Sequence, residues 1–175
     1  MNEKIEQYVR NHGRDFMEWL CDIISIPSPT GHEQAKGEWI LNLLHQWGAA
    51  GAYRDAAGNV VYPCHVKSGE KVALYTAHID TVFQDLQEIH IRQTGHILSA
   101  PSCSDNSASI AGLLFIIKMF HDLQLTPPQG LLFAFDVGEE GLGNLKGMRQ
   151  VMADWHGRIA EVVAVDCTFD TFVKI

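Results

Sequence analysis

Three short, almost continuously apolar runs, separated by segments of helical length, constrain the fold of this chain more than any other feature. The runs are Lys71–Ala77, Leu131–Val137 and Glu161–Asp166. A strand that is apolar along its whole length is covered on both faces, which is typical of sheets flanked by helices. Strands that alternate with helices connect by right-handed βαβ crossovers. The sequence therefore predicts an α/β fold with a mixed, partly parallel sheet.

Other patterns predict the elements between these strands. Apolar residues recur at helical spacing from Glu3 to Ile24, with Gly13 in the middle, so we expect one interrupted helix or two short ones. Thr30 and Glu33 have the form of a capping box, which predicts a helix from there through Trp47. The remaining expected elements are strands at 52–54 and 60–66, a hairpin of 88–92 with 96–99, helices at 107–123 and 144–155, and a strand at 171–175.

Length and composition limit the class of protein. A chain of 175 residues with 46% hydrophobic and 19% charged residues suits a single globular domain, residues 1–175. The formal net charge of −8 disfavours nucleic acid and anionic membranes as partners. The amino terminus shows no secretory signal, and the longest apolar stretch, IAGLLFIIKMF, is too short to span a bilayer. The four scattered cysteines favour reduced thiols and a cytoplasmic location.

Candidate ligand residues follow the predicted strands. His78 and Asp80 come after the first run, Glu139 and Glu140 after the second, and Asp166 ends the third. Asp105 lies in a small polar loop before an apolar helix. In an open α/β sheet, ligands bind at the carboxyl ends of the strands. One imidazole and several carboxylates at that edge are the ligand set of a two-metal hydrolytic site.

Each candidate also has a simpler interpretation. Asp80 could begin a turn, Asp105 could cap the following helix, and Asp166 could be a turn residue. Glu139 and Glu140 could be two solvated acids at a helix start. Adjacent carboxylates at the end of an apolar strand repel each other, however, and one of them could bind metal while the other accepts a proton from water. The conjunction of four such places in one chain favours the metal site.

These segments resemble a known family of proteins. The segment AHIDTVF is similar to the GHLDTV-type motif of the co-catalytic zinc peptidases and deacylases, which include aminoacylase, carboxypeptidase G, acetylornithine deacetylase, succinyl-diaminopimelate desuccinylase and peptidase T. PSCSDNSASIAGLL resembles the bridging-aspartate loop of this family, VGEEGLGNLKGMR its glutamate pair, and VAVDCTFD the segment with a further aspartate ligand. The resemblance implies a three-layer sandwich.

The resemblance also implies a role for each candidate residue. His78 and Asp166 would bind one zinc, Glu140 would bind the other, and Asp105 would bridge the two. Asp80 would orient the imidazole. A cis peptide bond would follow Asp105. The implied cofactor is zinc, with cobalt and manganese as alternatives.

The implied reaction is hydrolysis of an amide bond in a small peptide or an N-acyl amino acid by metal-activated water, with Glu139 as the general base. Family members are about twice as long and carry a lid or dimerisation domain and a second histidine ligand, neither of which is in this sequence. We therefore expect a truncated catalytic domain that holds one zinc or none and pairs with another copy of itself. The alternative is a catalytically incompetent relative that acts as a binding or scaffold module.

Overall fold

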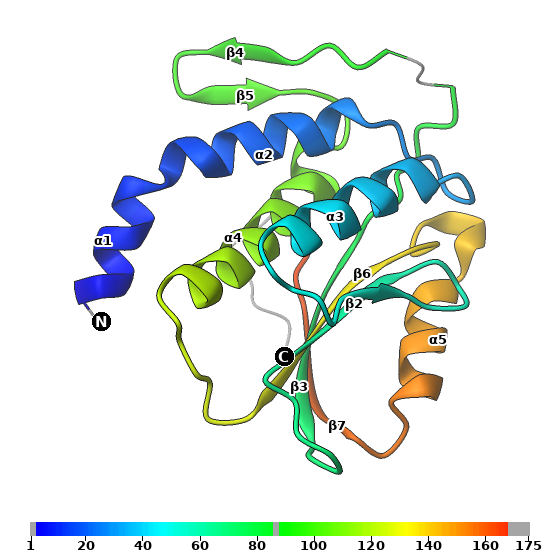
Figure 1. Cartoon of the computed structure of the whole chain (residues 1–175). Coiled ribbons are helices and arrows are strands. Elements are labelled where there is room, and N and C mark those ends of the chain that lie inside the picture. The colour runs from blue at the N-terminus through cyan, green and yellow to red at the C-terminus, as the bar shows by residue number, and fades with distance from the viewer. Residues whose placement is uncertain (1–2, 86–87, 168–175) are drawn as a thin grey trace.

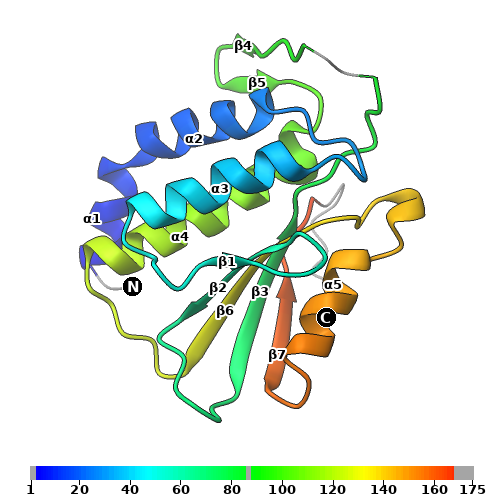
Figure 2. The same ribbon diagram turned by 45° about the vertical axis from the view of Figure 1, so that its right-hand side comes forward.

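Three layers of secondary structure make up the computed structural model, which describes residues 3–85 and 88–167. A group of helices covers one face of the central sheet, and α5 (Lys146–Asp154) covers the other (Figures 1 and 2). The helices of the first group are α2 (Gly13–Ser25), α3 (Gln34–Gln46) and α4 (Ser109–Asp122), with α1 (Glu3–Asn11) leading into α2. The predicted α/β sandwich with three layers is confirmed.

The central sheet has the strand order β1-β2-β6-β3-β7 and mixes parallel with antiparallel pairs. Strands β6, β3 and β7 run parallel to one another, whereas β2 is antiparallel to β6 and to β1. A separate β4–β5 hairpin lies beyond α2, away from the sheet (Figure 1). The strands are β1 (Tyr53–Arg54), β2 (Val60–Cys64), β3 (Val72–His78), β4 (Arg92–Thr94), β5 (Ile97–Ser99), β6 (Gly130–Asp136) and β7 (Ile159–Ala164).

Alternation along the buried strands divides the core into two parts. In β3, Ala73 and Ala77 belong to the cluster under α2, α3 and α4, and Val72 and Leu74 belong to the cluster under α5. Both faces of β3 and β6 are therefore covered, which explains why their sequences are apolar without alternation. Because β6, β3 and β7 are adjacent and parallel, their carboxyl ends meet at one edge.

Several sequence expectations can be compared with these elements. The amino-terminal segment forms two helices, α1 and α2, that meet at His12. The first strand of the hairpin begins at Arg92 rather than at residue 88, and β7 ends at Ala164, two residues before Asp166. The expected strand at 171–175 lies outside the described residues. No helix in the described part of the chain has the length and apolarity needed to cross a membrane.

Candidate metal centre

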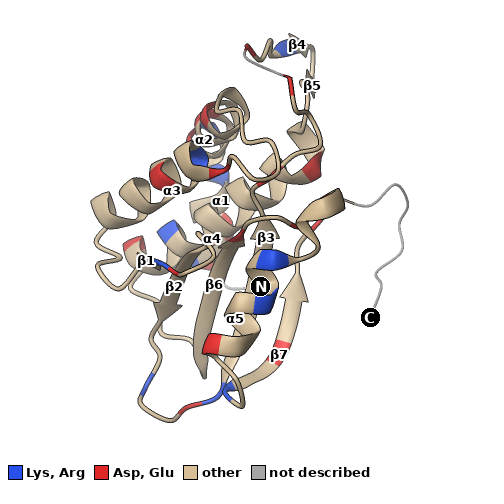
Figure 3. Cartoon of the chain, turned by 90° about the vertical axis from the view of Figure 1, so that its right-hand side faces the viewer, with Lys and Arg blue, Asp and Glu red and all other residues tan. Residues whose placement is uncertain are grey.

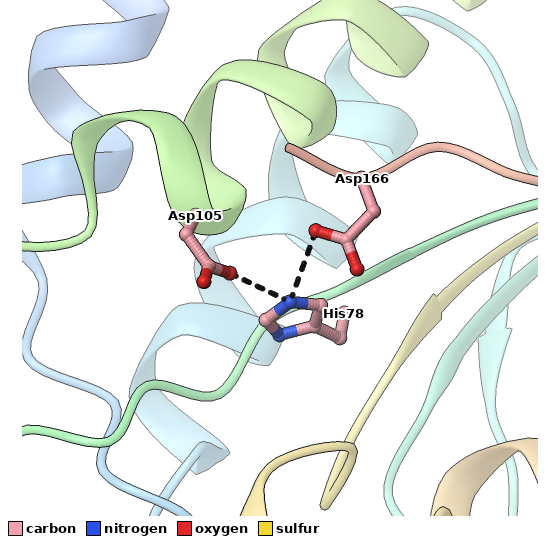
Figure 4. Close-up of side chains that lie close together, drawn as sticks. All are labelled: His78, Asp105 and Asp166. Atoms are coloured by element: carbon pink, nitrogen blue, oxygen red, sulfur yellow. Dashed lines mark hydrogen bonds and ion pairs between the residues drawn. The ribbon is translucent and has the colours of Figure 1, made fainter. Parts of the chain in front are cut away.

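His78, Asp105 and Asp166 come together at the carboxyl edge of the sheet from three separate segments of the chain (Figure 4). His78 ends β3, Asp166 follows β7, and Asp105 lies in the irregular turn that leads into α4. His78 Nε2 lies 3.1 Å from Asp105 Oδ1 and 3.7 Å from Asp166 Oδ1. Ligand atoms about 2.1 Å from a tetrahedral zinc are roughly 3.4 Å apart. The two distances bracket that value, so these donors fit a zinc ion.

Glu139 and Glu140 form a second possible ligand group with the same histidine. One donor atom from each of His78, Glu139 and Glu140 lies within 4.8 Å of the others. The imidazole offers only one nitrogen to a metal. Nδ1 is turned towards Asp80, and Nε2 is the nitrogen that faces Asp105. A nitrogen with one lone pair binds one metal. Within the described residues, therefore, the two groups compete for His78.

Asp80 contacts both His78 and the glutamate pair. His78 Nδ1 lies 3.1 Å from the backbone carbonyl oxygen of Asp80 and 3.6 Å from its Oδ1. The carbonyl is therefore the acceptor of the Nδ1–H group, and the carboxylate acts on the ring through its charge. The two carboxylate oxygens also accept hydrogen bonds from the backbone N–H groups of Glu139 and Glu140, each at 3.0 Å. Asp80 thus ties the end of β3 to the glutamate pair.

The predicted capping box at Thr30 and Glu33 is wrong. Helix α3 begins at Gln34, and neither residue makes a side-chain cap to it. Thr30 donates a hydrogen bond from Oγ1 to Asp80 at 2.9 Å. Glu33 accepts backbone hydrogen bonds from Gly31 and Gly138 at 2.8 and 3.2 Å. Both side chains therefore bind to groups at the strand ends, because the Asp80 carboxylate and a buried backbone N–H group need hydrogen-bond partners there.

The surroundings of the ionisable side chains in this region shift their pKa values. Burial alone would lower the pKa of His78, but Asp80 and the nearby carboxylates outweigh it and raise the pKa to about 9. Burial raises the pKa of both Glu139 and Glu140, and their acidic neighbours add to the effect. Burial would also raise the pKa of Asp80, but its hydrogen-bond donors hold it below the usual range. A cluster of carboxylates that raises proton affinity in this way is stabilised by a bound cation.

The turn that carries Asp105 is irregular. The peptide bond between Asp105 and Asn106 is cis, as the family resemblance implied. Asn106 is 2% exposed, its Nδ2 donates to Val165 O at 3.0 Å, and its Oδ1 has no partner. Asp105 does not cap α4, because the N-cap position is Ala108 and no side-chain cap to this helix is formed by the described residues. The simpler interpretation of this aspartate as a helix cap is therefore wrong.

Three residues near the site were not singled out from the sequence. Asp136, the last residue of β6, is 2% exposed and accepts a hydrogen bond from Thr76 Oγ1. Burial raises the pKa of Asp136 to about 6 in spite of this bond. Burial and the nearby carboxylates of Asp105 and Asp166 raise the pKa of the Cys167 thiol. A charged residue inside the apolar run GLLFAFDV was a signal that could have identified Asp136.

A mixed sheet that gathers one imidazole and several carboxylates at the carboxyl ends of its parallel strands defines the class: an α/β protein with a metal-type site at the sheet edge. The chain belongs to Peptidase family M20/M25/M40, which its residues 74–173 match. The peptidase and deacylase resemblance seen in the sequence is thereby confirmed at the level of the family.

Individual relatives show the same relation. A putative [LysW]-lysine/[LysW]-ornithine hydrolase of Pyrococcus abyssi is 32% identical over 134 residues, which cover 76% of this chain and 35% of that protein. In fold the chain resembles human carnosine dipeptidase 1, with a TM-score of 0.76, 14% identity and coverage of 97% and 42% of the two chains.

A tripeptidase from Staphylococcus aureus gives a TM-score of 0.69 at 19% identity, with coverage of 89% of this chain and 43% of that chain. The chain thus spans between 35% and 43% of the length of these three relatives.

Proposed function

We propose that this chain is the metal-binding part of the catalytic domain of a zinc-dependent amide hydrolase, with a small peptide or an N-acyl amino acid as substrate. The observation that carries the proposal is the convergence of His78, Asp105 and Asp166 at one sheet edge, next to Glu139 and Glu140. Family membership supports a peptidase or amidohydrolase. Cobalt and manganese are alternatives to zinc, and the cytoplasm remains the expected location.

The residues divide the chemistry among them. His78, Asp105, Asp166 and Glu140 would hold metal, and a bound zinc in this position would polarise a substrate carbonyl and acidify a water molecule. Glu139 takes a proton from the attacking water and passes it to the leaving amine. Its raised pKa suits a group that must both accept and release a proton. Asp80 holds the backbone of Glu139 and Glu140 in place through its two carboxylate oxygens.

The second candidate function, a catalytically incompetent binding or scaffold module, is favoured by one observation. Both ligand groups within the described residues draw on His78, so the second metal position lacks a full set of protein donors. We therefore expect the chain to hold one zinc or none and to hydrolyse amides poorly. Metal analysis of the purified chain, followed by assays on dipeptides and N-acetyl amino acids, distinguishes the two functions. Two tightly bound zinc ions with rapid turnover would refute the module.

The variant Glu139→Gln, made in a full-length relative built on this sequence, tests the proposed base. We expect turnover to fall by roughly 10²–10⁴-fold, because the amide cannot accept a proton. Zinc content, measured by inductively coupled plasma mass spectrometry, should not change. Glu161→Gln, on the exposed strand β7, is the matched control and should alter neither quantity. Loss of zinc in the Glu139→Gln protein would make Glu139 a ligand, and the proposed division of roles would be wrong.

A further inference from the structure

Asp136 is a buried acid that the proposed chemistry does not use. It ends β6 and is paired in register with His78 at the end of β3. Val72 and Leu74 of β3, and Leu132 and Ala134 of β6, pack under α5. Because side chains alternate along a strand, Thr76, His78 and Asp136 lie on the same face of the sheet as these apolar residues. The polar side chains therefore lie together on the α5 side, directly above an apolar cluster.

The charge of Asp136 is compensated by one neutral hydrogen-bond donor and by the imidazole of His78. Its carboxylate accepts a side-chain hydrogen bond from Thr76, a neutral donor. No lysine or arginine in residues 3–85 and 88–167 lies within ion-pair distance of it. A buried carboxylate with one neutral donor is costly unless a positive charge is close. The position next to His78 makes the metal that His78 would bind a suitable source of that charge.

A small cavity connects Asp136 to the metal centre. It has a volume of 110 Å³, and its lining includes Asp136, His78, Asn106, Glu139 and Asp166. The buried Oδ1 of Asn106 has no partner. Asn106 thus adds a second buried oxygen acceptor to this cavity, beside the Asp136 carboxylate. Asn106 Oδ1 and the Asp136 carboxylate are both hydrogen-bond acceptors. Buried oxygen acceptors without enough donors favour a nearby cation.

We propose that Asp136 is a positioning residue for the metal: its buried carboxylate, held by Thr76, lies on the same small cavity as His78 and raises the affinity of the His78, Asp105 and Asp166 group for a divalent cation. Asp136 touches neither the metal nor the substrate. The inference rests on the proposed function, because it requires a metal at this group. Groups hydrogen-bonded to metal ligands commonly change metal affinity by roughly 10- to 100-fold, and we expect the same range for the charge of Asp136 across the cavity.

The test compares zinc affinity in matched variants by competition with a chromophoric chelator. Asp136→Asn keeps the size of the side chain and an oxygen for the Thr76 hydrogen bond, but it removes the charge. We expect zinc to bind roughly 10–100 times more weakly. Asp154→Asn removes an exposed charge at the end of α5 and should leave the affinity unchanged. Thr76→Val, which lacks the hydroxyl donor, should weaken zinc binding, whereas Thr76→Ser, which keeps it, should bind zinc as the parent chain does.

Folding stability of the metal-free proteins separates positioning from structure. We expect Asp136→Asn to unfold at the same temperature as the parent chain or higher, because a buried charge is removed. Equal zinc affinity in Asp136→Asn and the parent chain would refute this inference alone. A weaker affinity with an equal loss of metal-free stability would also overturn it, since Asp136 would then be structural. A parent chain that binds no zinc would instead refute the proposed function.

Discussion

Lys36 places an ammonium group inside the protein. It lies on the buried face of α3 and is 1% exposed. Burial lowers its pKa to about 8, and the negative charge of Asp80 opposes this shift. The group that compensates Lys36 is therefore also the carboxylate that holds the glutamate pair. The apolar spacing of α3 gave no indication of such a contact, because a lysine at one position of a helix is usually solvated.

Replacing Lys36 by Met should stabilise the fold. The folded pKa lies below the unfolded value, so the unfolded chain binds more protons between about pH 8 and pH 10.5. The cost of burying the charge is therefore fully present below pH 8 and disappears as the pH rises to 10.5. We expect Lys36→Met to raise the free energy of unfolding by roughly 1–3 kcal/mol at pH 7 and by much less at pH 10.

Urea denaturation at the two pH values measures this difference. Lys36→Arg keeps the charge and serves as the control, for which no gain is expected. The same gain for Lys36→Met at pH 7 and pH 10 would show that packing, and not charge, is responsible.

At the scale of elements, the junction between β6 and α5 positions the glutamate pair. Gly147, in the first turn of α5, donates its N–H group to Val137 O at 2.9 Å. Asn59 bridges the same place, since its Nδ2 donates to Gly147 O and its Oδ1 accepts from Val137 N, both at 2.9 Å. A Cβ atom at Gly147 would overlap Asn59 and the backbone of Val137. Only glycine allows α5 to approach β6 so closely.

Gly147→Ala should therefore destabilise the protein by about 1–3 kcal/mol, since the new methyl group forces the two backbones apart. The same shift should weaken zinc binding, because it moves Glu139 and Glu140. Gly112→Ala is the control: it lies in α4 with nothing near its Cβ position, so a gain of roughly 0.5–1 kcal/mol is expected. Thermal unfolding and zinc titration of both variants check the prediction, which fails if the two substitutions have similar effects.

At the scale of the whole molecule, β7 is the edge strand of the central sheet. It pairs with β3 on one side, and no other described strand pairs with it. Val162 and Val163 point to opposite faces and are 47% and 40% exposed. Figure 3 shows a single acidic band on β7 and no basic one. An edge that is apolar and nearly uncharged is suited to pairing with another chain.

We therefore expect the chain to self-associate through this edge, and Val162→Lys to weaken the association. A lysine on an edge strand opposes pairing, because its charge would have to be buried. Sedimentation velocity over a range of concentrations measures the change. Met152→Lys, at an exposed position of α5, is the matched control. A monomer at every concentration, or equal effects of both substitutions, would contradict this prediction.

Local patterns predicted much of the fold. The apolar runs that became β3 and β6 and the two amino-terminal helices follow from periodicity, because burial on one or both faces leaves a direct trace in the chain. The motifs also predicted the residues that meet at the sheet edge. His78, Glu139, Glu140 and Asp166 were identified by their positions after strands, since parallel strands bring their carboxyl ends together, and Asp105 by its place in a polar loop before a helix.

What the sequence determined by itself was therefore the set of elements and the set of candidate ligands. Only the tertiary structure decided which donor meets which acceptor. Thr30 and Glu33 bond to groups at the strand ends and do not cap α3. The Asp80 carboxylate accepts from backbone N–H groups as well as lying near His78 Nδ1, and Asp136 is paired in register with His78. The reason is physical: periodicity reports how a residue faces the core, whereas a hydrogen bond depends on which polar groups from distant segments are buried beside it.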